Sequence, residues 1–195
     1  YILRDPSASG TARTDKLGDA TALGNGRFLV MERDDRIDQN ANKLVFEIDL
    51  KGATDIHAGA VLTAFASAFP TKTLELATVD ELASVNIYPV HKQLVTNLGP
   101  LGYTGVSKTE GLTLIDANTV AVLNDNDFGM LAEPIPGNGV LPVNPAPEPI
   151  LLGLVRFDQA NGLDASDRDS ESGGPAIKIQ NWPVLGLFMP DGIAA

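Results

Sequence analysis

The chain has 195 residues, of which 44% are hydrophobic, so it is long enough to bury one good core. Acidic residues outnumber basic ones by 25 to 14, and the formal net charge of −11 argues against a nucleic-acid partner. Cysteine is absent, which excludes disulfides and thiolate metal sites, and two histidines leave little for a zinc site. The remaining oxygen ligands suit calcium or magnesium.

No run of about eighteen apolar residues is present, so no membrane span is expected. The chain begins at Tyr1 without methionine and ends in MPDGIAA, which has the form of a turn and the opening of a strand. We therefore expect a fragment of a longer polypeptide. Because processing removes targeting signals, the lack of a signal peptide does not point to the cytoplasm.

Residues 1–23 are rich in Gly, Ser, Thr and Asp without a lasting period, and they are predicted to form a loop. A Gly-Asn-Gly turn then leads into a strand at 28–31, and KLVFEIDL at 43–50 alternates apolar and polar residues as its antiparallel partner. Glu32 and Arg33 directly follow the first strand. They either form a salt bridge at the end of the sheet or lie at the mouth of a site.

The alanine-rich segment from 53 to 84 predicts a short helical insertion near 55–84. Thr78 and Glu81 have the spacing of a capping box, which predicts a helix near Val79 to Ser84. The insertion is either a lid or an excursion without a role. A further strand is predicted at 92–98.

The most informative stretch is KTEGLTLIDANTVAVLNDNDFG, from Lys108 to Gly129. Two apolar runs flank the turn at 116–118 and predict a β-hairpin that runs out into the acidic stretch 124–127. Because successive strand side chains alternate faces, Glu110 and part of this stretch are expected to meet at one end of the hairpin. That end is predicted to be strongly anionic.

Six prolines fall between residues 132 and 149, and they indicate a linker or long surface loop between a portion at 1–131 and another at 150–195. A strand at 151–158 then leads to a loop with Asp164, and with Asp167, Asp169 and Glu171 at the two-residue spacing of a calcium loop. An EF-hand is excluded, because Lys178 stands where its last glutamate belongs. The loop is either a calcium site or simply a solvated acidic loop.

The strand pairs predict an all-β, mainly antiparallel fold, with hairpins enough for about four blades of a partial β-propeller, or a sandwich. An incomplete propeller exposes strand edges. We therefore expect the missing blades to come from remaining segments of the parent polypeptide or from other chains. The portion at 150–195 belongs either to the same propeller or to a second one.

Three motifs in order, GNGRFLVMERDD, KLVFEIDLKGATDI and KTEGLTLIDANTVAVLNDNDFG, resemble the domain family "esterase-like activity of phytase" over about residues 15–130. The end of the chain, about 150–195, is similar to the propeller-like region of choice-of-anchor I proteins, which are associated with alkaline phosphatases. These resemblances imply a propeller-like protein that is secreted, periplasmic or at the cell surface. Neither family supplies a catalytic set that transfers residue by residue.

Two functions compete. The first is a calcium-dependent, phytase-like hydrolase of phosphoric or carboxylic esters, in which carboxylates hold the cations and basic groups contact substrate oxygens. The candidate metal ligands are Glu32, Glu110, Asp125, Asp127, Asp164, Asp167 and Asp169, and the candidate catalytic residues are Glu110, Arg33 and Lys108. No G-x-S-x-G motif is present, which disfavours a serine esterase. The second function is a non-catalytic, calcium-stabilised propeller module for structure, adhesion or binding.

Overall fold

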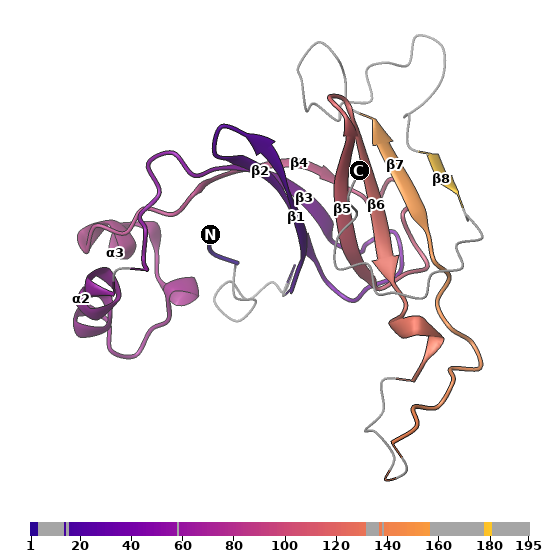
Figure 1. The fold of residues 1–195 in the computed structure, drawn as a ribbon. Coiled ribbons are helices and arrows are strands. Elements are labelled where there is room, and N and C mark those ends of the chain that lie inside the picture. The colour runs from indigo at the N-terminus through magenta and orange to yellow at the C-terminus, as the bar shows by residue number, and fades with distance from the viewer. Residues whose placement is uncertain are drawn as a thin grey trace.

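Two four-stranded antiparallel sheets form the framework of the described residues (Figure 1). The structure is a computed structural model that describes residues 1–3, 14, 16–57, 59–131, 137 and 139–156, and the backbone of 178–180. The strand orders are β1-β2-β3-β4 and β5-β6-β7-β8, so each strand pairs with its neighbours in the sequence. The predicted all-β, antiparallel fold is confirmed. The described strands do not close into a barrel or a propeller.

The first sheet contains β1 (Lys16–Gly24), β2 (Arg27–Arg33), β3 (Lys43–Asp49) and β4 (His91–Asn97). Asn25 and Gly26 have φ of 53° and 78°, the left-handed values that a two-residue type I′ hairpin needs. The prediction that residues 1–23 form a loop was wrong from Lys16 onward. The sequence of β1 is rich in small and polar residues, so it shows no strand pattern. Its pairing with β2 overrides the weak strand propensity of these residues.

The connection between β3 and β4 carries the predicted helical insertion, with α2 (Ala60–Ala68), η1 (Leu74–Leu76) and α3 (Val79–Ser84). The capping box at the start of α3 is confirmed, because Thr78 and Glu81 exchange side-chain and backbone hydrogen bonds. The helices have a small core of their own around Phe65, Leu82 and Ile87. In Figure 1 they lie beside the first sheet, on the side away from the second.

The second sheet contains β5 (Lys108–Asp116), β6 (Thr119–Asp125), β7 (Leu152–Arg156) and β8 (Lys178–Gln180), with a short 3₁₀ turn, η2 (Asp127–Gly129), after β6. The hairpin predicted around residues 116–118 is confirmed, and Asp116 closes its turn by accepting a hydrogen bond from the Asn118 amide at 2.8 Å. β7 pairs with β6, so the sheet continues on both sides of the proline-rich segment. The domain boundary placed there stays a prediction.

The main core lies between the two sheets, with Leu29, Met31 and Val45 from the first and Leu112 and Val122 among its members from the second. β1 lies against β5. Their approach requires glycine at position 18, because a Cβ there would lie 2.2 Å from the carbonyl oxygen of Thr109. This packing brings the start of β5 next to the end of β2.

None of the helices in the described residues is both long and apolar enough to cross a membrane.

Candidate functional site

Arg33 connects the two sheets at the end where β2 stops and β5 begins. Its side chain is only 4% exposed, and its two terminal nitrogens donate to Asp35 at 2.7 Å and to Glu110. Lys16 donates to the other oxygen of Asp35 at 2.7 Å. These bonds, led by the one from Lys16, lower the pKa of Asp35. Alternating charges therefore tie β1, β2 and β5 together.

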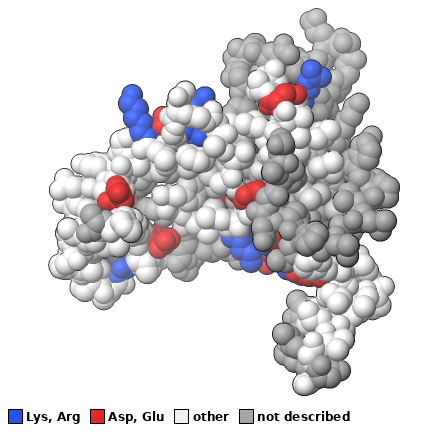
Figure 2. Space-filling model, viewed as in Figure 1, with Lys and Arg blue, Asp and Glu red and all other residues white. Residues whose placement is uncertain are grey.

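Charged side chains of both signs adjoin at the underside of the main body in Figure 2, above the lobe that projects downward. Within the described residues, the Nε–H of Arg33 is buried and has no acceptor. An unsatisfied donor beside two ion pairs is tolerated because the charged bonds of the same guanidinium are strong.

Glu32 lies in a separate buried network on the first sheet. Its side chain is 2% exposed and accepts from Thr14 at 2.7 Å, from the Tyr1 hydroxyl and from the Lys92 ammonium. That ammonium also lies 4.2 Å from the centre of the Phe46 ring. Burial, and then the bond to Glu32, raise the pKa of Tyr1 well above its ordinary value. A carboxylate with three protein donors suits a structural role.

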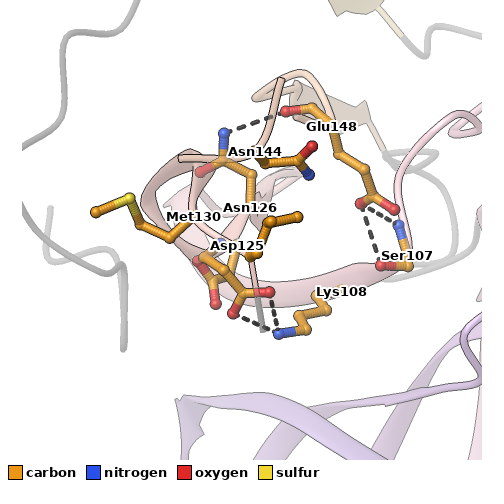
Figure 3. Close-up of a pocket in the computed structure, with 9 residues that line it drawn as sticks. Ser107, Lys108, Asp125, Asn126, Met130, Asn144 and Glu148 are labelled. Atoms are coloured by element: carbon orange, nitrogen blue, oxygen red, sulfur yellow. Dashed lines mark hydrogen bonds and ion pairs between the residues drawn. The ribbon is translucent and has the colours of Figure 1, made fainter. Parts of the chain in front are cut away.

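A pocket of about 160 Å³ opens where the β5–β6 hairpin ends (Figure 3). Lys108 and Asp125, which oppose each other in the strand ladder, both line it. The Lys108 ammonium lies 2.5 and 2.6 Å from the two carboxylate oxygens of Asp127. Burial opposes the charge of Lys108, but the bond to Asp127 and the charges of Asp125 and Glu110 outweigh it, so its pKa is raised.

A left-handed turn places Asp127 over this pocket. Asp127, Phe128 and Gly129 have φ of 54°, 57° and 69° in succession. Non-glycine residues in this region cost about 1–3 kcal/mol each, so the surrounding contacts must hold the turn. One such contact is the Asp127 amide, which donates to the Asp125 carboxylate at 2.9 Å. The turn directs the Asp127 carboxylate back toward Lys108.

The proline-rich segment forms one wall of the pocket, and we call its residues 140–151 the strap. Asn124 donates to the carbonyl of Pro149 at 2.9 Å and accepts from the Leu151 amide at 2.7 Å. Glu148 accepts from the amide and hydroxyl of Ser107 at 2.8 and 3.1 Å (Figure 3). These side-chain hydrogen bonds hold the strap in place, where prolines leave few backbone donors to do so.

The acidic side chains of the pocket do not fit a calcium ion as they stand. No group of three or more His, Cys, Asp or Glu residues is placed to hold a metal ion in the part of the chain that the structure describes. The oxygen donors are of the kind that calcium prefers. However, Lys108 already occupies the position beside both oxygens of Asp127.

The family model for phytase-like proteins, described as "Esterase-like activity of phytase", matches residues 1–128 of the 195-residue chain. The chain belongs to the phytase-like family. The family predicted from the three sequence motifs is thereby confirmed. No significant match was found for this phytase-like chain among curated proteins or among solved structures. The similarity of residues 150–195 to choice-of-anchor I proteins stays a prediction.

In this phytase-like chain, the candidate site residues that were predicted from the sequence lie in three separate places. Glu32 lies in its own buried network, Arg33 and Glu110 join the sheets, and the pocket gathers the remaining described ones, Lys108, Asp125 and Asp127. The nominated aspartates of the acidic loop, Asp164, Asp167 and Asp169, lie outside the described residues.

Asn126 belongs to the acidic stretch 124–127 that the sequence pointed to, whereas sequence reasoning missed three other polar residues of the pocket wall, Ser107, Asn144 and Glu148. Glu148 stands among prolines, where a linker was the simplest interpretation. Asn124 and Asn126 alternate with Asp125 and Asp127 in the sequence. An asparagine can donate hydrogen bonds and an ionised aspartate cannot, so this alternation was the available signal that the asparagines bond to backbone carbonyls.

Proposed function

We propose that this phytase-like chain is part of a β-propeller that hydrolyses phosphoric or carboxylic esters in a secreted, periplasmic or cell-surface protein. The observation that carries the proposal is the pocket at the end of the β5–β6 hairpin, where a basic side chain and several carboxylates meet beside Glu110. Membership of the family named for esterase-like activity of phytase supports it.

Glu110 is the proposed acid–base group. Its side chain is 30% exposed, so water and substrate can reach it, while Arg33 holds its carboxylate from the buried side. In this role the carboxylate takes a proton from the water that attacks the phosphorus or carbonyl carbon, and it gives that proton to the alcohol oxygen when the ester bond breaks. Arg33 is 4% exposed, and it serves as a positioning residue for Glu110 and not as a substrate contact.

Lys108 is the proposed contact for substrate oxygens. Its side chain is 32% exposed at the mouth of the pocket, and its ammonium can exchange Asp127 for an anionic oxygen of similar charge. A lysine with its ordinary pKa of 10.5 is protonated at neutral pH, and the pKa of Lys108 is raised further by Asp127.

Calcium is a further part of the proposal, because an ion lets a carboxylate-lined site accept an anionic phosphate. Asp125 and Asp127 are the described carboxylates closest to this purpose. A full coordination shell needs further ligands, for which the acidic loop with Asp164, Asp167 and Asp169 is the nominated source.

The two sheets support a propeller, because each is a four-stranded antiparallel meander and their first strands, β1 and β5, lie together. Leu94 and Ile115 are 52% and 53% exposed on strands of the two sheets. Further blades, from other segments of the polypeptide or from other chains, are the proposed partners that cover such apolar side chains.

The test is turnover of p-nitrophenyl phosphate and p-nitrophenyl acetate by the purified chain, with calcium and with a chelator. We expect chelation to abolish turnover and Glu110→Gln to lower kcat/KM by about 100-fold or more, since general acid–base groups contribute that much. Glu75→Gln, at an exposed glutamate of η1, is the matched control and should leave turnover unchanged.

Absent turnover, or equal turnover by the Glu110→Gln variant, would contradict the hydrolase. A chain that loses thermal stability in chelator but never turns over either ester would instead support the non-catalytic, calcium-stabilised module.

A further inference from the structure

Glu148 of the strap is bound in the pocket by donors that suit any anionic oxygen. One oxygen of its carboxylate accepts from both the amide and the hydroxyl of Ser107, at 2.8 and 3.1 Å. Figure 3 shows the two bonds converging on the carboxylate. An N–H and an O–H that converge on one oxygen are an arrangement that recognises negative charge.

Lys43 supplies a positive charge behind the same serine. It is 0% exposed, and its ammonium donates to the Ser107 carbonyl at 3.1 Å. None of the ion pairs among the described residues includes Lys43. Burial lowers the pKa of Lys43, and the charges of Asp34 and Glu148 are the two largest that oppose this shift. A buried ammonium without a contact ion pair therefore favours a negative charge at the position of the Glu148 carboxylate.

The Glu148 side chain can turn away while the strap keeps its place. Asn124 bonds to Pro149 and Leu151, and Asn126 donates to the backbone carbonyl of Glu148 at 3.1 Å. These bonds hold the backbone of the strap without the carboxylate. The pocket of about 160 Å³ is several times the volume of one water, about 30 Å³, so it has room for a phosphate or carboxylate group.

We infer that Ser107 is an anion-binding site of this pocket, that the Glu148 carboxylate occupies it when no ligand is bound, and that an anionic oxygen of a phosphate or carboxylate group replaces Glu148 there. Exchange of one negative charge for another preserves the charge that faces Lys43. Because Glu148 is tethered beside the site, it competes at a high effective concentration and lowers the affinity of the pocket for free anions.

This inference deepens the proposed function, on which it rests, by adding Ser107 to Lys108 as a contact for substrate oxygens. Both residues line the same pocket. The two contacts differ in origin, because Lys108 exchanges an exposed partner and Ser107 exchanges a carboxylate of the strap.

The test is titration calorimetry of the full 195-residue chain with inorganic phosphate and, separately, with acetate. Ionic strength is constant and a chelator is present, so that no divalent ion bridges the anion to the carboxylates of the pocket. We expect Glu148→Ala to bind at least one of the two anions at least tenfold more tightly than the unaltered chain does. Phosphate and acetate together decide whether the site prefers a phosphate or a carboxylate group.

Glu75→Ala is the matched control, because it removes the same charge at an exposed glutamate of η1 outside this pocket. It should bind both anions as the unaltered chain does. Adding Ser107→Ala to Glu148→Ala should remove most of the gain, because the hydroxyl donor is lost. Adding Lys43→Met to Glu148→Ala should weaken binding several-fold, because the charge behind the serine is lost.

Equal affinity of Glu148→Ala and the unaltered chain for both anions, no binding by either, or a gain that persists in full without the Ser107 hydroxyl would each overturn the inference. Glu148→Gln repeats the comparison if the alanine variant does not fold, and its neutral amide should give a smaller gain. The readout needs no turnover. A chain that hydrolyses no ester can therefore still show the anion site, and an active chain can fail to show it.

Discussion

Lys108 and Glu110 stand two residues apart on β5, yet their ion pairs differ in kind. Glu110 pairs back to Arg33 of the first sheet, with side chains 30% and 4% exposed. Lys108 pairs forward to Asp127, with side chains 32% and 37% exposed. A pair with a buried member is costly to break, whereas an exposed pair contributes little to stability. The first pair therefore suits holding the sheets together, and the second suits exchange with a ligand.

The largest expected effect is at Arg33. Arg33→Ala removes the guanidinium that joins Asp35 and Glu110 across the sheets, and we expect it to lower the free energy of unfolding by about 3–5 kcal/mol, as for other broken buried pairs. Urea denaturation measures this loss. Arg27→Ala, which breaks the more exposed pair with Glu47, is the control and should cost under about 1 kcal/mol. Similar losses in both variants would remove the distinction between the two kinds of pair.

The strap, which forms one wall of the pocket beside the exposed pair, is held by Asn124. This side chain is 1% exposed and bonds to Pro149 and Leu151. Asn124→Ala leaves the buried Leu151 amide without its acceptor and the Pro149 carbonyl without its donor, and we expect a loss of about 1–3 kcal/mol. Hydrogen exchange at the Leu151 amide should accelerate with it. Protection that persists at Leu151 would show that the strap is held by other contacts.

The close approach of β1 and β5 can be tested at Gly18. Gly18→Ala places a Cβ 2.2 Å from the Thr109 carbonyl, so the strands must separate, and we expect a loss of about 1–3 kcal/mol. Gly137→Ala is the control, because a Cβ there meets no atom within 4 Å. Thermal unfolding of the two variants gives the comparison. Equal unfolding temperatures for the two variants would mean that β1 and β5 can separate without loss of stability.

The smallest effect is the pH dependence of two lysines. Burial, the largest cause, lowers the pKa of Lys43, which is 0% exposed, whereas the pKa of Lys108 is raised. The ordinary value is 10.5 for both. Lys108 therefore contributes stability below that pH and loses it as the pH rises through its folded pKa. Lys43 acts oppositely, because its folded state disfavours the charge and gains stability as the pH rises toward 10.5.

Thermal unfolding from pH 8 to about pH 11.5 should show this contrast, with the upper limit set about one unit above the ordinary lysine pKa. At pH 8, Lys108→Met should unfold at a lower temperature than the unaltered chain, and this difference should shrink at the alkaline end. For Lys43→Met, any gain in unfolding temperature from removing the buried charge should be largest at pH 8 and should shrink at the alkaline end. Parallel profiles for both variants would contradict the opposite signs.

Strands with clear alternation could be predicted from the sequence, because their period is set by local geometry. The alternating KLVFEIDL became β3, and the turn at Asp116 came out in its predicted place. β1 could not be found in this way, since its strand state depends on pairing with β2 and on packing against β5. Its Asp19 even accepts a hydrogen bond from the Leu112 amide of the other sheet at 2.8 Å, a contact that no local pattern encodes.

The candidate site could be predicted in part. The anionic end of the β5–β6 hairpin followed from strand alternation, and Asp125 and Asp127 do line one pocket with Lys108. The partners of each charge could not be foreseen, because they come from distant parts of the chain, as with Arg33 and Glu110. The sequence shows which charges exist, whereas packing decides which of them neutralise one another.

The long connection between β3 and β4 has a consequence for the order of folding. A two-residue turn joins β1 to β2 and a loop at 34–42 joins β2 to β3, but β4 joins β3 only after the much longer helical insertion that runs from residue 50 to 90. Closing a longer loop costs only about 0.6 kcal/mol per doubling of its length, yet that cost is met before β4 makes its contacts. β4 should therefore dock late in the folding reaction. Substitutions in β4 should speed unfolding and leave the refolding rate nearly unchanged, in contrast to substitutions in β2.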